Sequence, residues 1–342
     1  SFVEPTLVGG PEISGGGCRS RDARDTPMGI PRQKTRFAAA IPFSHQLVSP
    51  RARRKLRGYL VAYLFVLPAA ALYFTFVLRP IGEVFVLSFH KWDGISPIRE
   101  WVGLANFAKL LADPIFWQAF QHNIAWTVML IFFNVLLGLV AAALLSMNIK
   151  GRVIFRLGYF LPVIQASIVT AMIWRWIYNP DGLLNAALRA VGLGQLARGW
   201  LGDFTFALPA LGVAAGWASF GLGIVIFLAG MQGVDQTLYD AARVDGANAR
   251  QTFLHITIPA LRNVITVVVL LTMIGSFQVF DLIWVMTRGG PIRATEMLAT
   301  YMYKRGLLEN QYGYGSAVAV VLCVIILGFS IIYVGLRERG NE

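Results

Sequence analysis

The sequence predicts an all-α protein, a polytopic membrane helix bundle, from its composition and from six long apolar runs. Of its 342 residues, 56% are hydrophobic and only 14% are charged, and the mean hydropathy is +0.60. Soluble domains carry about 25% charged residues, so this balance is typical of a chain that crosses a membrane several times. Two cysteines are too few for a disulfide framework.

The apolar runs are long enough for transmembrane helices, which need about 20 residues to cross the hydrocarbon core. They lie at 58–78, 124–147, 157–174, 206–231, 264–280 and 312–336. None of them alternates between apolar and polar residues as a membrane β-strand does. We therefore expect six transmembrane helices within residues 58–336.

Basic residues are concentrated before the first run. Eleven of the 30 Lys and Arg precede residue 58, and the seven-residue segment 51–57 holds a cluster of them. This composition predicts that residues 1–57 form a basic, mostly disordered cytoplasmic tail that contacts lipid headgroups. A nucleic-acid partner is not expected.

The distribution of positive charge also predicts the orientation. With both termini inside, the linkers 148–156 and 232–263 and the C-terminal tail 337–342 hold 8 Lys and Arg in 47 positions. The opposite linkers hold 11 in 107 positions. Because cytoplasmic loops are enriched in Lys and Arg, we expect both termini on the cytoplasmic side.

Several kinds of chemistry lack the residues that they need. The chain has no G-x-x-x-x-G-K-[ST], no H-E-x-x-H and no G-x-S-x-G, so no catalytic residue is predicted. Its four histidines are scattered and predict no metal site. The runs also lack the buried acidic and His chains of a proton-coupled carrier, Asp281 coming closest. These absences disfavour a membrane enzyme and an ion-coupled secondary carrier, and they indicate an energy source on another chain.

A polar segment, residues 238–259, separates the fourth and fifth runs. Asp235 or Thr237 can cap a short helix, and Asp240 can pair with Arg243 one turn later. Positions at helical spacing are Leu238, Ala241, Ala242 and Asp245. Gly246 permits a sharp change of direction.

A second short helix is expected after this turn, over residues 247–255, with Pro259 ending it. The segment would then be a two-armed element that lies along the membrane face. It would either rest on the lipid headgroups or fit a groove on another protein.

This segment resembles the EAA loop of binding-protein-dependent ABC importer permeases, which reads E-A-A-x3-G-x9-I-x-L-P. The spacing is kept throughout, with Asp240 in place of Glu and Ile258 in place of Leu. The matching positions are Asp240, Ala241, Ala242, Gly246, Ile256, Ile258 and Pro259. Residues 101–120, 279–291, 295–298 and 312–317 also resemble segments of the sugar-type permeases, with Arg288 where glycine is usual.

The resemblance covers about residues 59–336 and implies a six-helix permease of the type I ABC importer fold in a bacterial inner membrane. It implies that the loop at about 235–259 is a coupling helix, with Asp245 included, which docks on an ATP-binding subunit. The implied partners are a second permease, two ATP-binding subunits that hold ATP and Mg, and an external solute-binding protein. No cofactor is expected in this chain.

A sugar path should combine aromatic faces with amide and hydroxyl groups inside the bundle. The candidates on the fourth and fifth runs are Trp217, Ser219, Phe220, Phe277, Gln278 and Asp281. The aromatic three could equally pack against other helices or lipid, whereas an amide such as Gln278 prefers the bundle interior. We expect a neutral sugar or oligosaccharide. The faintly positive outer linkers leave an anionic substrate, a uronate oligosaccharide or glycerol phosphate, as the alternative.

Overall fold

Helices predominate in the residues that the computed structural model describes, 50–146 and 152–339. The chain separates into two compact units, Ser1–Leu64 and Phe65–Glu342. The sole strand pairing in the described ranges is antiparallel and joins β1 (His90–Lys91) to β2 (Glu100–Trp101), with His90 opposite Trp101. The all-α prediction is confirmed.

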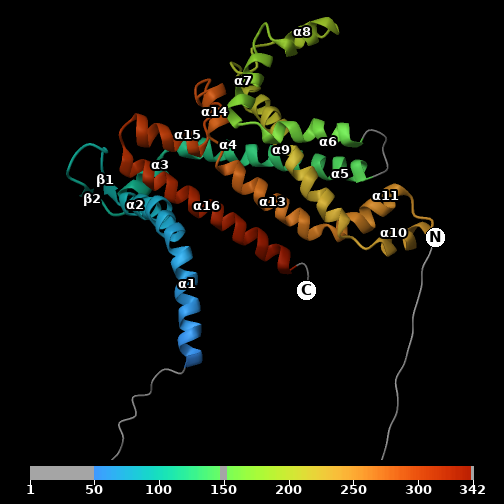
Figure 1. The fold of residues 1–342 in the computed structure, drawn as a ribbon. Coiled ribbons are helices and arrows are strands. Elements are labelled where there is room, and N and C mark those ends of the chain that lie inside the picture. Colours follow the sequence, from blue (N-terminus) through green and yellow to red (C-terminus); the bar gives the residue numbers. More distant parts are fainter. Residues whose placement is uncertain (1–49, 147–151, 340–342) are drawn as a thin grey trace, which may run out of the picture. The chain divides into compact units, whose positions relative to one another are not determined.

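The first half of the described chain consists of α-helices with short π or 3₁₀ turns between some of them, and Figure 1 labels the α-helices. They are α1 (Pro50–Tyr73), η1 (Phe74–Leu78), α2 (Arg79–Leu87), α3 (Ala105–Ala112), α4 (Pro114–Ile131), η2 (Phe132–Leu137), α5 (Gly138–Ser146), α6 (Arg152–Phe160), η3 (Leu161–Ile164), α7 (Ser167–Ile177), α8 (Leu183–Ala190) and η4 (Gly194–Leu196).

The second half begins with a long uninterrupted helix and ends with another. Its elements are α9 (Ala207–Gln232), α10 (Gln236–Val244), α11 (Ala249–Thr252), η5 (Phe253–Thr257), α12 (Ile258–Ala260), α13 (Arg262–Phe277), α14 (Asp281–Met286), α15 (Leu298–Tyr303), η6 (Lys304–Leu308) and α16 (Tyr312–Arg339).

Four continuous helical stretches are long and apolar enough to cross a membrane: Val61–Leu87, Pro114–Ser146, Ala207–Gln232 and Tyr312–Arg337. Two bent pairs, Leu157–Ile164 with Ser167–Ile177 and Ala249–Ala260 with Arg262–Phe277, bring the number to six when each pair counts as one span. Each of the six predicted runs therefore falls on one of these candidates.

The third run is a broken span, although the sequence predicts one helix over 157–174. Its two halves meet at 110°. Pro162 cannot donate a backbone hydrogen bond, so α6 tightens into the 3₁₀ turn η3, and Gln165 and Ala166 are extended before α7 begins. A second bend, of 70°, lies at Leu261 between α12 and α13, just before the fifth run.

Both predicted tails differ from the structure where it describes them. Helix α1 already begins at Pro50, so the basic cluster 51–57 is helical, and α16 continues to Arg339. Lys and Arg are good helix formers, which lets both helices extend beyond their apolar parts. Residues 1–49 and 340–342, the rest of these tails, lie outside the described residues.

The centre of the second unit is formed by α4, α9 and α13, which lie side by side (Figure 1). Glycines of α9 allow the backbones of neighbouring helices to approach α9 closely. A Cβ on Gly223 would collide with the backbone carbonyl of Asn134 in η2, and one on Gly221 with that of Tyr159 in α6. The packing of α9 against two neighbouring helices therefore depends on the absence of side chains at these positions.

The segment after α14 contains backbone of unusual conformation. Arg288 has φ +52°, in the left-handed region that costs most residues about 1–2 kcal/mol. Glycine adopts this region freely. A glycine at position 288 would avoid this cost.

Candidate functional site

The segment between α9 and α13 folds through its own short-range hydrogen bonds. Asp235 caps α10, its Oδ1 accepting the Thr237 amide at 2.9 Å. Arg243 donates to Asp240 at 3.0 Å, as the sequence predicts, and both side chains are exposed. The first arm of the predicted element is thus confirmed.

Gly246 ends this arm in a left-handed conformation, with φ +73°. The amide of Gly246 donates to the carbonyl of Arg243 at 3.2 Å, and that of Ala247 to the carbonyl of Ala242 at 2.9 Å. These two bonds form a Schellman motif, in which C′ is usually glycine. No atom lies within 4 Å of a Cβ built on Gly246, so the requirement for glycine is one of backbone conformation and not of space.

The second arm begins with a capping box that we did not predict. The Asn248 side chain accepts the Gln251 amide at 2.9 Å, and the Gln251 side chain accepts the Asn248 amide at 2.9 Å. The signal was present in the sequence as N-x-x-Q, beginning two residues after the glycine.

Pro259 does not end the second arm as predicted. The chain passes from α11 through the π-helical turn η5 into α12, where Pro259 occupies the first turn, and it bends only at Leu261. Proline is tolerated there because the first-turn amides of a helix need no intrahelical acceptor.

The segment is attached to the bundle on one side and exposed on the other. Ala242 is buried, and Tyr239 contacts Thr257 through their hydroxyls at 3.2 Å. Phe253, Ile258 and Leu261 belong to a hydrophobic cluster with α5 and α9. Of the predicted coupling residues, Asp240, Ala241, Asp245, Gly246 and Pro259 are exposed, and Ile256 and Ile258 are half-buried. A displacement of this segment would therefore move the ends of α9 and α13 to which it is joined.

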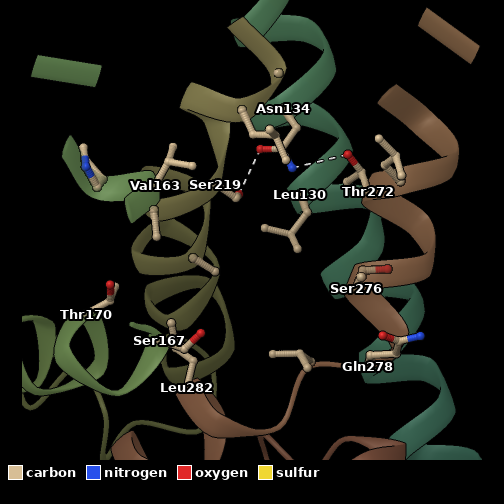
Figure 2. A pocket seen from close by; sticks show the side chains of 18 of the residues that line it. Leu130, Asn134, Val163, Ser167, Thr170, Ser219, Thr272, Ser276, Gln278 and Leu282 are labelled. Atoms are coloured by element: carbon tan, nitrogen blue, oxygen red, sulfur yellow. Dashed lines mark hydrogen bonds between the residues drawn. The ribbon is translucent and has the colours of Figure 1, made fainter. Parts of the chain in front are cut away.

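A polar cavity of about 470 Å³ lies between the opposite halves of these helices (Figure 2). Its walls come from α4, η2, α7, α9, α13 and the start of α14. Ser219 donates to Asn134 Oδ1 at 2.9 Å, and Asn134 Nδ2 donates to Thr272 Oγ1 at 3.3 Å. Asn134 therefore joins α9 and α13 at the cavity wall, as the dashed lines in Figure 2 show.

A second set of polar contacts joins α4 to α13 further along the cavity. Thr127 of α4 bonds Ser276 of α13 through their hydroxyls at 2.6 Å. Asn123 Nδ2 donates to the carbonyl of Ser276 at 3.3 Å, and its Oδ1 accepts the Leu298 amide at 2.8 Å. Buried amide and hydroxyl groups of this kind hold membrane helices together.

Half of the predicted path residues line the cavity. Ser219, Gln278 and Asp281 do so, whereas Trp217, Phe220 and Phe277 are absent from its walls.

The other three pack against neighbouring side chains. Phe277 is fully buried and stacks on Phe329, Trp217 packs edge-on against Trp174, and Phe220 contacts the cluster around α5. These three positions have the packing role that the sequence left open for aromatic residues, and their part in a solute path is untested.

The structure adds cavity residues that the sequence analysis did not name. Trp126, Gln165 and Thr170 each carry a buried polar atom without a hydrogen-bond partner. Polar residues inside apolar runs are the signal that could have identified Asn134 and Thr170. Gln165 comes to the cavity only because the third span is broken.

The cavity is polar but nearly without charge. Asp281 is the single ionisable side chain among the described residues that line it. Nowhere in ranges 50–146 and 152–339 do three His, Cys, Asp or Glu side chains gather as metal ligands would. Amides, hydroxyls and an indole N–H are the groups that bind a polyhydroxylated, uncharged molecule.

Comparison with known proteins assigns this chain to one family. Residues 134–339 match the family described as "Binding-protein-dependent transport system inner membrane component". The probable ABC transporter permease protein YurN of Bacillus subtilis is 38% identical over 83% of this chain and 98% of its own length. The trehalose/maltose transport system permease protein MalF of Thermococcus litoralis is 32% identical over 82% of this chain and 95% of its own.

A third relative, the arabinooligosaccharides transport system permease protein AraP of Bacillus subtilis, is 34% identical over 82% of this chain and 88% of its own. Among solved structures, a bacterial ABC transporter involved in the import of the acidic polysaccharide alginate has a similar fold, with a TM-score of 0.74 at 20% identity. That likeness covers 85% of this chain and all of the other.

Proposed function

This chain belongs to the family of binding-protein-dependent transport system inner membrane components, and from that premise we propose that it is the permease of an ATP-driven importer for a sugar or oligosaccharide. The observation that carries the proposal is that the family match, residues 134–339, contains the segment from α10 to α12 and all lining residues of the polar cavity except Trp126 and Leu130. One chain thus combines a cavity that would bind a solute with a segment that would bind an ATP-binding subunit.

ATP and Mg would be held by two separate ATP-binding subunits, because this sequence has no phosphate-binding loop. A second permease chain and an external solute-binding protein complete the proposed assembly. The alginate transporter is also known in complex with an alginate pentasaccharide-bound periplasmic protein, which supports the last partner. Both termini would face the cytoplasm.

The coupling residues would be Asp240, Ala241, Ala242, Asp245, Gly246, Ile256, Ile258 and Pro259. The exposed side of α10 would contact the ATP-binding subunit, and closure of that subunit would pull on α10. Ile258 and Leu261 would pass the displacement to α9 and α13, whose far halves carry Ser219 and Thr272. The cavity would then open to the other side of the membrane, a switch between two packed states.

A neutral saccharide suits the cavity better than an anionic one. Relatives are named for trehalose and maltose, lactose and arabinooligosaccharides. The cavity offers hydroxyls and amides, and its only formal charge is the carboxylate of Asp281, which would repel a uronate or a phosphate. Ser219, Gln278 and Asp281 are the residues that we expect to contact the solute, together with Asn134 and Thr170.

Purification with native partners tests the proposal. We expect ATP-binding subunits to co-purify and the reconstituted complex to hydrolyse ATP faster when its binding protein and one neutral saccharide are present. The panel should include maltose, trehalose, lactose, arabinooligosaccharides and a uronate disaccharide. Uptake that requires an ion gradient and no ATP would refute the assignment.

A further inference from the structure

The largest open cavity at the α10–α12 end of the bundle is separate from the solute cavity. It has a volume of about 790 Å³ and lies between the ends of α5 and α9 and the helices α10 and α11. It shares no lining residue with the polar cavity between α7 and α13. The proposed function assigns no role to it.

Its walls divide by chemistry. The α5 and α9 side is mainly apolar, with Val140, Ala143, Leu144, Leu228 and Met231, and it carries Ser146 and Gln232 at the ends of the two helices. The opposite side is more polar and has Gln236, Tyr239, Arg243, Arg250 and Thr252 of the segment that follows α9, beside Ala247, Ala249, Phe253 and Thr257. One wall therefore suits hydrocarbon, and the other suits a hydrated, charged group at the membrane surface.

The polar wall carries positive charge only. Arg243 and Arg250 line the cavity, and no Asp or Glu is among its described lining residues. Arg243 also pairs with Asp240, but both side chains are mostly exposed, and such a pair is weak. Arg250 forms no ion pair within the part of the chain that the structure describes. The cavity thus presents two arginines at its rim, one paired with an exposed carboxylate and one without an ion pair among the described residues.

Helix α10 presents this rim on one face and its other exposed residues on the opposite face. Gln236, Tyr239 and Arg243 recur at i, i+3 and i+7 and line the cavity. The opposite face carries the exposed side chains of Leu238, Ala241 and Val244, the last 87% exposed. A partner subunit that binds the second face leaves the first face free.

We propose that this cavity binds an anionic phospholipid of the inner leaflet, with its phosphate between Arg243 and Arg250 and its acyl chains along Val140, Leu144 and Leu228. Basic pockets between helices on the cytoplasmic side bind anionic headgroups. The apolar wall selects a lipid over free phosphate.

Because α10 forms part of the site, the lipid stabilises α10 against the bundle and raises the efficiency with which ATP hydrolysis drives uptake. That last effect rests on the proposed function, and the choice of the inner leaflet rests on the proposed orientation of the chain.

Lipid retention by the whole complex tests the site. Complexes are purified from bilayers of phosphatidylcholine with and without phosphatidylglycerol, and bound lipid is counted by native mass spectrometry. We expect the wild type to retain phosphatidylglycerol in preference to phosphatidylcholine. Arg243→Gln with Arg250→Gln lowers the affinity about 30-fold, five- to sixfold for each arginine.

Two further variants separate charge from shape. Arg262→Gln removes an exposed arginine that lies outside the cavity and leaves retention unchanged. Ala143→Trp fills the apolar half, keeps both arginines and reduces retention, so that the test stands even where the arginine variants assemble poorly. Inorganic phosphate in excess displaces no lipid.

Equal retention of both lipids by the wild type would overturn the proposal, as would retention unaffected by Ala143→Trp. Displacement by inorganic phosphate would indicate an anion site without a lipid. A complex that holds no lipid, but in which Thr252→Cys cross-links to an ATP-binding subunit, would assign the cavity to that subunit. None of these results bears on ATP-driven uptake of a saccharide, which is measured separately.

Discussion

The two functional regions of this permease are held together by contacts of very different range in the sequence. In the coupling segment, the bonds that shape the turn join residues two to five positions apart, such as Asp235 to Thr237 and Asn248 to Gln251. In the solute cavity, Asn134 bonds Ser219 and Thr272, which lie 85 and 138 positions away. The first region is a local structure, and the second exists only when three helices have packed.

This difference predicts where the effects of substitutions appear. A change in the coupling segment should alter coupling while the bundle stays folded, because few distant residues depend on it. A change at the cavity wall should lower the stability of the whole bundle, because it removes contacts through which neighbouring helices stabilise one another. The predictions below run from the largest expected effect on stability to the smallest.

Gly223→Val should destabilise the bundle most, by about 2–3 kcal/mol, because the added side chain collides with the backbone carbonyl of Asn134. Thermal unfolding in detergent measures the effect. Gly82→Val is the matched control, since a Cβ at Gly82 meets no atom within 4 Å. Equal unfolding temperatures for the two variants would show that α9 and η2 are not closely packed.

Gly246→Val should cost about 1–2 kcal/mol, confined to the turn, because valine must adopt φ +73°. We expect a folded permease that assembles poorly with its ATP-binding subunits or hydrolyses ATP without uptake. Asparagine tolerates this conformation, so Gly246→Asn should retain uptake. Wild-type uptake by the valine variant would contradict the coupling role.

Ser219→Ala removes one bond of the cavity wall and should cost about 0.6–1.7 kcal/mol. It should also weaken the stimulation of ATP hydrolysis by the solute, because Ser219 lines the cavity. Ser330→Ala serves as the control, since the Ser330 hydroxyl bonds only the Ile326 carbonyl of its own helix among the described contacts. Identical behaviour of both variants would argue against a cavity role for Ser219.

Asp240→Asn should change stability by no more than about 0.5 kcal/mol, because the pair with Arg243 is exposed. Chemical unfolding of the isolated permease tests this value. Glu83→Gln, which removes the exposed pair with Arg79, should behave alike. A loss several times larger for Asp240 alone would mean that the coupling segment is less local than its contacts indicate.

Much of the fold follows from the sequence, because apolar length and helix-ending residues act locally. Each of the six predicted spans corresponds to a helix or a bent pair of helices, and the turn at Gly246 has the predicted backbone freedom. The break in the third span was not predicted, since a proline in an apolar run is compatible with a kink or with a straight helix, and only the packing around Gln165 decides between them. A break before the fifth span was predicted at Pro259, and the structure places it at Leu261.

The sequence by itself determined the coupling segment: its caps, its glycine turn and its resemblance to other permeases are encoded within about 25 consecutive residues. The tertiary structure decided which polar residues form the cavity. It brings Asn134, Thr170 and Ser219 together and buries Phe277 in a hydrophobic cluster. Helical periodicity gives each residue a face of its own helix, but which neighbour covers that face depends on contacts between segments far apart in the chain.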